Sequence, residues 1–261
     1  MKSIEQLVKT IAKLRSPKGC PWDKEQTHKT LKRYLIEETY ETLEAIDRND
    51  PQALMEELGD VLLQVVLHAQ IACENKEFSF SQVADYVNKK MISRHPHVFS
   101  NTLVKTSEEV MTNWEIIKKT EKPHRKDIFD GIPIALPALL KALKVSKKAA
   151  RDGFEWKKEI DIWKTLNSEI KEFKAACRGQ NKQKKADEMG DILFTIVNIA
   201  RWCKLDPEDS LSMATKKFIS RYTRVKTKLK SSKKGIKELS YSELNNLWRL
   251  AKKQERKKDD K

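Results

Sequence analysis

The chain has 261 residues, of which 35% are charged, and its 53 lysines and arginines outnumber its 38 acids to leave a formal net charge of +15. Only 7 glycines and 8 prolines occur, and there are no alternating apolar runs joined by Asn-Gly or Asp-Gly turns. We therefore expect a mostly helical protein with one large or two small domains. Four scattered cysteines without a Cys-x-x-Cys pair are typical of reduced thiols in the cytoplasm. The longest apolar stretch is too short to span a bilayer, so we expect no membrane partner.

The first elements along the chain are predicted to be helices. Residues 1–16 have polar side chains every two or three positions, which indicates an amphipathic helix and not a signal peptide. Residues 33–46, RYLIEETYETLEAI, predict an acidic helix on which Glu37, Glu38 and Glu41 share a face. A turn at residues 47–52 then starts a second helix, in which apolar residues recur with a 3.6-residue period.

The acidic pattern occurs twice. EELGD (56–60) corresponds to DEMGD (187–191) at an offset of 131, and the same offset relates Glu38 and Glu41 to Glu169 and Glu172. The spacing Glu-x2-Glu-x15-Glu-x2-Asp is therefore present twice without a gap. This predicts two related halves, each with an acidic helix, a short turn and a second helix.

The proline and glycine positions suggest where the halves divide. The predicted parts are an N-terminal domain (1–120), a linker (121–137), a C-terminal domain (138–230) and a C-terminal helix with a basic tail (231–261). The lysine-rich end, 252–261, is expected to fray. Gly59 and Gly190 lie inside predicted helices, where glycine costs about 1 kcal/mol relative to alanine. That cost favours a close approach of another helix at these glycines, and helix ends at these positions are the alternative.

Each helical hairpin would bring four carboxylates together. Two such charges 4 Å apart repel by roughly 4 kcal/mol at an effective dielectric constant of about 20. A divalent cation bound between them makes the electrostatic energy of the cluster favourable. Carboxylates without histidine or cysteine favour Mg²⁺, with Mn²⁺ possible. The predicted metal ligands are Glu38, Glu41, Glu57 and Asp60 in the first half, and Glu169, Glu172, Glu188 and Asp191 in the second. The alternative is a solvated acidic face paired with lysines, which the duplicated spacing disfavours.

Both halves also carry a basic helix downstream, within residues 87–99 and 214–226. Lys90 and Arg94 are four residues apart, as are Lys217 and Arg221, so each pair forms a cationic ridge that can hold phosphates. Ordinary surface lysines are the alternative. Acids and a basic ridge in one bundle are the combination expected for metal-assisted chemistry on a polyphosphate.

Several motifs resemble the MazG nucleoside triphosphate pyrophosphohydrolases. They are CPWDKEQTHKTL (20–31), YLIEETYETLEAID (34–47), EELGDVLLQVVLHAQ (56–70), RHPHVF (94–99), and the second-copy motifs DGFEW (152–156) and DEMGDILFTIVNIAR (187–201). The resemblance implies an all-α fold of tandem MazG-type helical bundles, each four-helix-bundle-like and completed by dimerisation, hence a homodimer. It implies Mg²⁺-dependent conversion of nucleoside triphosphates to monophosphates and pyrophosphate, either in nucleotide-pool housecleaning or in lowering a signalling nucleotide pool. Stacking of the base on a tryptophan, with few base-specific contacts, would give broad base specificity.

The family's metal-binding acids fall on the four predicted metal ligands of each half, here called the quartet of that half. Its Asn-x-Lys-x3-Arg pattern falls on Asn88, Lys90 and Arg94. The second half departs at Ser168, where the first half has an acid, and at Thr215, where it has the asparagine. We expect a carboxylate-held water to attack the α-phosphorus, with the basic pairs neutralising pyrophosphate. The candidate catalytic residues are Glu37, Glu38, Glu41 and Glu169, and the candidate substrate-binding residues are Asn88, Lys90, Arg94, Lys217, Arg221, Trp22 and Trp248.

Two other classes of protein are alternatives to a pyrophosphohydrolase. A non-enzymatic nucleic-acid-binding protein would explain the net charge, but the chain has no RNP, KH or zinc-finger motif, so nucleic acid is not an expected partner. A di-iron oxygenase needs Glu-x-x-His on two helices, which neither half supplies. His68 lies too far along its helix from Asp60 to be an expected ligand and is predicted to pack in the bundle or to neighbour the substrate.

Overall fold

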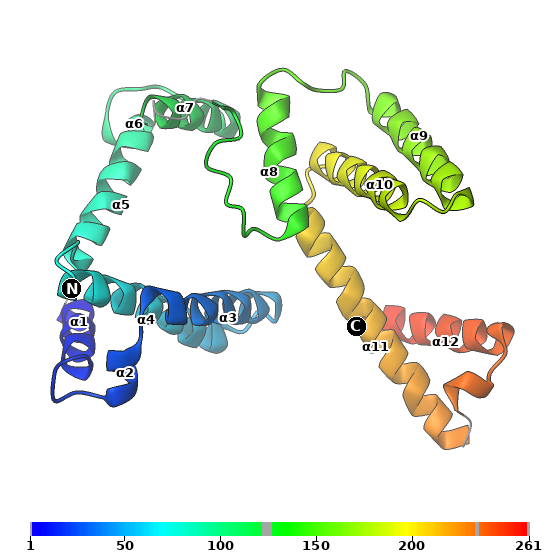
Figure 1. The fold of residues 1–261 in the computed structure, drawn as a ribbon, viewed down its shortest axis with the longest axis horizontal. Coiled ribbons are helices and arrows are strands. Elements are labelled where there is room, and N and C mark those ends of the chain that lie inside the picture. Colours follow the sequence, from blue (N-terminus) through cyan, green and yellow to red (C-terminus); the bar gives the residue numbers. More distant parts are fainter. Residues whose placement is uncertain (1, 122–126, 233–234, 260–261) are drawn as a thin grey trace. The chain divides into compact units, whose positions relative to one another are not determined.

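The computed structural model describes residues 2–121, 127–232 and 235–259. Within them every regular element is helical, which confirms the predicted all-α fold (Figure 1). The chain divides into two compact units, residues 1–122 and residues 123–261. No helix in the described part is both long and apolar enough to cross a membrane.

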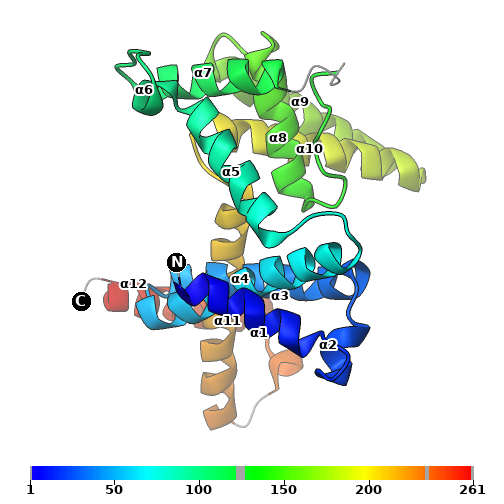
Figure 2. The same ribbon diagram turned by 90° about the vertical axis from the view of Figure 1, so that its left-hand side faces the viewer.

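Unit 1 is built on a helical hairpin. Its elements are α1 (Lys2–Leu14), α2 (Pro21–Glu25), α3 (His28–Asp47), α4 (Pro51–Glu74), α5 (Phe80–Arg94), α6 (Pro96–Phe99) and α7 (Ser107–Thr120). Helices α3 and α4 pack together, α1 lies against α4 (Figure 2), and α5 leads from the hairpin to α6 and α7. The buried core gathers around Leu31, which is fully buried, together with Ile11 and Val66.

Local signals explain why the hairpin turns where it does. Thr27 caps α3 and forms a reciprocal capping box with Thr30, which satisfies backbone N–H groups that have no partner inside the helix. Asp50 caps α4 ahead of Pro51, the residue type favoured at the first helical position. Between the helices Asn49 adopts a left-handed backbone conformation, with φ of 50°. These residues place the end of α3 beside the start of α4.

Unit 2 repeats this plan. Its elements are α8 (Ala138–Arg151), α9 (Glu159–Arg178), α10 (Lys182–Trp202), α11 (Pro207–Ser232), the 3₁₀ helix η1 (Ile236–Glu238) and α12 (Tyr241–Asp259). Helices α9 and α10 form the hairpin, with Asn181 capping α10, and α8 packs on α10 as α1 packs on α4. Both hairpins therefore present the end of an acidic helix beside the start of the next helix.

An arginine–glutamate pair ties the first helix of each unit to the hairpin, with the charges exchanged. In unit 1, Arg15 after α1 donates to Glu74 of α4 at 2.8 Å. In unit 2, Arg201 of α10 donates to Glu155 after α8 at 2.7 Å, and to Ser146 of α8 at 2.6 Å. The ion pair is therefore present in both units, but the arginine and the glutamate have changed places.

Two expectations from the sequence were wrong. Among the described residues, a Cβ atom added at Gly59 or Gly190 would meet nothing within 4 Å, so the close helix approach is not found at either glycine. The lysine-rich end is not frayed as far as it is described, because α12 continues to Asp259 and Glu255 accepts a hydrogen bond from Arg221 at 2.6 Å. Residues 260 and 261 lie outside the described residues. Helix α12 instead shares a core with α11 through Ala251 and Val225.

Replacing Gly190 with alanine should stabilise the chain by up to about 1 kcal/mol, because alanine has the higher helix propensity and the space beside Gly190 is open. Urea unfolding of the wild type and the Gly190→Ala variant measures the difference. A loss of stability would show instead that a second chain packs against α10 at this point.

Candidate metal centre

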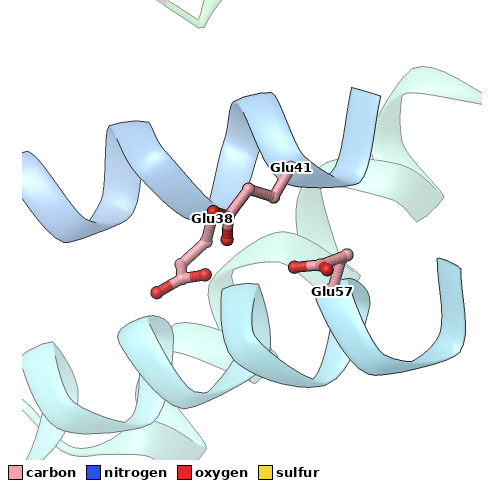
Figure 3. Close-up of side chains that lie close together, drawn as sticks. All are labelled: Glu38, Glu41 and Glu57. Atoms are coloured by element: carbon pink, nitrogen blue, oxygen red, sulfur yellow. The ribbon is translucent and has the colours of Figure 1, made fainter. Parts of the chain in front are cut away.

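Three carboxylates converge between the helices of the first hairpin. Glu38 and Glu41 of α3 and Glu57 of α4 each offer an oxygen atom, and these atoms lie within 4.8 Å of one another. Figure 3 shows the three side chains in the space between the two helices. Glu38 and Glu57 are half-buried and Glu41 is exposed. One turn of helix separates the two acids of α3, which is why they reach the same point.

The second hairpin holds an equivalent cluster. Glu169 and Glu172 of α9 and Glu188 of α10 also bring oxygen atoms within 4.8 Å of one another, with the same pattern of burial. Ser168, at the position of Glu37, donates a hydrogen bond to Glu172 at 3.0 Å. The serine therefore orients one acid of this cluster and adds no charge to it.

The fourth predicted acid of each quartet stands next to the three-carboxylate cluster. Asp60 is outside the group of close oxygen atoms in unit 1, as is Asp191 in unit 2. Each is still near enough to act electrostatically: Asp60 raises the pKa of Glu38, and Asp191 raises the pKa of Glu169.

Burial is the first cause of the raised pKa values in both clusters, and neighbouring carboxylates are the second. Burial raises the pKa of Glu38 above its ordinary value, and Asp60 and Glu41 raise it further. The pKa of Glu57 is raised by burial and then by Glu41. Such shifts mean that the ionised cluster is electrostatically unfavourable by itself. A hard cation would remove that cost, and a set of carboxylate oxygens suits Mg²⁺ or Mn²⁺.

These shifts predict how stability depends on pH. Because the folded pKa values of Glu38 and Glu169 exceed the unfolded value of about 4.3, the native state binds more protons in that window. The metal-free protein should therefore lose stability as the pH rises through the raised pKa values. Thermal melts in EDTA and in saturating Mg²⁺ test this. The increase in melting temperature caused by Mg²⁺ should be larger at pH 7 than at pH 5, and an increase independent of pH would contradict the prediction.

The predicted cationic ridges are partly engaged in ion pairs. Arg94 is buried, and its Nε and one terminal nitrogen donate to Glu121 at 3.0 and 2.5 Å. Its guanidinium also lies over the ring of Trp114, 5.2 Å from the centroid. Lys90 is half-buried near the ring of Tyr86.

Unit 2 repeats the arginine pair. Arg221 donates to Glu255 at 2.6 Å, while Lys217 is exposed. The ring of Trp248 lies against that of Phe218, with centroids 5.1 Å apart.

The remaining residues singled out in the sequence lie outside the three-carboxylate clusters. Glu37 and Asn88 are exposed, and Trp22 is half exposed beside Tyr34. His68 contacts His28 through their Nδ1 atoms at 2.7 Å, which places it away from the acids.

Helices α7 and α12 were missed as members of the repeat. Residues 114–121, WEIIKKTE, and 248–255, WRLAKKQE, share the pattern Trp-x3-Lys-Lys-x-Glu. The tryptophan of each lies beside the basic helix, and the glutamate of each binds its arginine. This pattern was available in the sequence, but it occurs at an offset of 134 instead of 131.

Comparison with known proteins accounts for the duplicated site. The family model described as the MazG nucleotide pyrophosphohydrolase domain matches residues 26–99 and again residues 158–226. The chain belongs to the MazG family. Among relatives of this MazG protein is the "Nucleoside triphosphate pyrophosphohydrolase/pyrophosphatase MazG" of Thermotoga maritima, 41% identical over 95% of each chain. The "Nucleoside triphosphate pyrophosphohydrolase" of Escherichia coli K12 is 37% identical over 98% of this chain and 99% of its own. Bacillus subtilis YabN, named as uncharacterized, is 45% identical over 94% of this chain and 51% of its own length.

Proposed function

We propose that this MazG protein hydrolyses nucleoside and deoxynucleoside triphosphates to monophosphates and pyrophosphate, with Mg²⁺ and broad base specificity, as a cytoplasmic housecleaning enzyme. The observation that carries the proposal is the pair of three-carboxylate clusters, one inside each match to the family. The names of the relatives from Thermotoga maritima and Escherichia coli support the same reaction.

The carboxylates fit the metal that this reaction needs. Glu38, Glu41 and Glu57 would hold Mg²⁺ in unit 1, with Asp60 beside them, and the equivalent acids would do so in unit 2. Bound there, Mg²⁺ would neutralise phosphate oxygens and polarise the phosphorus under attack.

Other side chains are proposed to orient the attacking water and to bind the phosphates. Glu37 is the proposed orienter of the attacking water in unit 1. Ser168 at the equivalent position is a hydroxyl that already donates to Glu172, so unit 2 must orient water through the carboxylates of its cluster. The exposed amine of Lys217 is available for phosphate, whereas Arg94 and Arg221 can offer only the N–H groups not bound to Glu121 and Glu255.

The bond that is cleaved can be tested directly. Incubating the protein with each triphosphate and Mg²⁺ should yield pyrophosphate and a monophosphate, resolved by ion-exchange chromatography. Production of orthophosphate and a diphosphate would contradict the proposal. The rates across bases and sugars measure the specificity.

A homodimer is proposed from the apolar surface of the first hairpin. Ile36, Tyr40 and Leu43 follow the spacing of one helical face on α3 and are each at least 50% exposed. Apolar side chains exposed in a row are typical of a protein interface. A second copy would bury them, and light scattering over a range of concentrations measures the mass.

A further inference from the structure

The net positive charge of the chain lies wholly in unit 2. Residues 1–122 hold 18 lysines and arginines and 19 acids, a formal net charge of −1, whereas residues 123–261 hold 35 and 19, a net charge of +16. Residues 207–261 alone hold 17 basic and 7 acidic residues. A generally lysine-rich composition would place the excess in both units. Unit 1 repeats the same hairpin and acidic cluster without it, so the charge is not a requirement of the fold.

The basic residues form continuous faces on the two C-terminal helices. Lys217, Arg221, Arg224 and Lys228 of α11 are spaced by four, three and four residues, which places them on one side of the helix. On α12, three cationic side chains are exposed within two turns. They are Arg249, Lys252 and Lys253.

Three acids of this hairpin are already bound to other groups. Glu238 accepts from the backbone N–H of Gly235 at 3.1 Å, and Glu243 accepts from that of Ser240 at 2.8 Å. Glu255 is bound to Arg221. Of these seven cations only Arg221 is paired with an acid among the described contacts, so the charges of the other six are not neutralised by a described ion pair.

We propose that the α11–α12 hairpin is a docking surface for the phosphate backbone of nucleic acid, in addition to the proposed hydrolysis. Uncompensated lysines and arginines on adjoining helices are the groups that neutralise phosphates, and binding of this kind reads no base sequence. It therefore needs none of the recognition motifs that the sequence lacks.

An anionic membrane is the less suitable partner. A helix that lies on a bilayer inserts an exposed apolar face. The apolar side of α12 is instead occupied, because Ala251 is buried and Leu247 packs with it against Val225 and Leu229 of α11. The exposed apolar residues of α12, Tyr241 and Leu250, are nine positions apart and so lie on opposite sides of the helix. Those of α11 end at Tyr222, ahead of Arg224 and Lys228.

The test is fluorescence anisotropy of the full-length protein with short fluorescein-labelled oligonucleotides of mixed sequence, single-stranded and duplex, at increasing salt. Four phosphate contacts predict that the affinity for the duplex falls roughly 100-fold between about 50 and 200 mM salt. The test variant combines Arg224→Glu, Lys228→Glu, Lys252→Glu and Lys253→Glu. It should bind at least about tenfold more weakly at low salt and show a flatter salt dependence.

A matched control changes the same number of charges in unit 1, at exposed lysines on α1, α3 and α5. It combines Lys9→Glu, Lys13→Glu, Lys29→Glu and Lys89→Glu. The control should keep wild-type binding. An equal loss in the control would overturn the proposal, because net charge alone would then explain the binding.

Three further measurements keep the outcome decisive. Circular dichroism and thermal melts of the test variant must match the wild type, and a version with glutamine at the same four positions replaces it if they do not. Sedimentation with phosphatidylserine vesicles but no oligonucleotide binding would assign the surface to a membrane and overturn the proposal. Pyrophosphate release is measured separately, so that failure of the proposed hydrolysis and failure of nucleic-acid binding are distinguishable.

Discussion

Replacing Glu38 and Glu169 together with glutamine should lower triphosphate hydrolysis by roughly 100-fold or more. Each acid is the half-buried member of its three-carboxylate cluster on the first hairpin helix. The amide keeps the size of the side chain and removes the charge that holds a hard cation. Metal stabilisation of the charge on a reacting phosphate contributes several kcal/mol, and each 1.36 kcal/mol corresponds to a factor of ten in rate.

The single variants show how the activity is divided. If unit 1 carries the turnover, Glu38→Gln alone reproduces the full loss, and if unit 2 does, Glu169→Gln alone reproduces it. Glu77→Gln, an exposed acid outside both clusters, should leave the rate unchanged. Wild-type activity in the double variant would show that the carboxylate clusters are not the catalytic sites.

The same double variant should be more stable than the wild type when metal is absent. Burial and neighbouring carboxylates raise the pKa values of Glu38 and Glu169, so their ionised forms destabilise the native state at neutral pH. Neutral glutamines remove that repulsion. A lower activity combined with a higher melting temperature in EDTA distinguishes loss of a metal site from general unfolding, which would lower both.

The hairpins and acidic clusters could be predicted because their signals are local and repeated. Asp50 and Pro51 mark the start of a helix by themselves, and the spacing of Glu38 and Glu41 fixes their common face. The turn between the helices then sets which acids of the second helix face them. No contact at long range needed to be known for these conclusions.

The remaining features depend on contacts between residues far apart in the sequence. The ion pair Arg15–Glu74 joins residues 59 positions apart. In unit 2 the arginine belongs to the hairpin and the glutamate follows the first helix, so the two units share no sequence motif for this ion pair. The close approach predicted at Gly59 failed for a related reason. The sequence shows that glycine is present, but what lies beside it is decided by tertiary packing.

Arg94 was predicted from a local sequence pattern, but its ion pair is made with a residue far along the chain. Replacing Arg94 with alanine should destabilise the protein by about 2–3 kcal/mol. The side chain is 8% exposed, donates twice to Glu121 and lies over Trp114. Its removal takes two charge-assisted hydrogen bonds from Glu121, which also accepts from the hydroxyl of Ser93 at 2.8 Å. Hydrogen bonds to charged groups contribute about 1.5–3 kcal/mol, and the partner left behind is only partly hydrated.

The surface pair Arg48–Glu44 is the matched control, because its atoms are also 2.5 Å apart while both side chains are more than half exposed. Arg48→Ala should cost less than about 1 kcal/mol, since solvent screens exposed ion pairs. Urea unfolding of both variants gives the two costs, and Arg94→Lys should recover only part of the loss because lysine lacks the planar, two-donor geometry.

The kinetics separate the structural role of Arg94 from the proposed substrate contact. A large rise in KM with unchanged stability would show that Arg94 acts on the phosphate, whereas a stability loss with little change in KM would show that it holds α5 against α7.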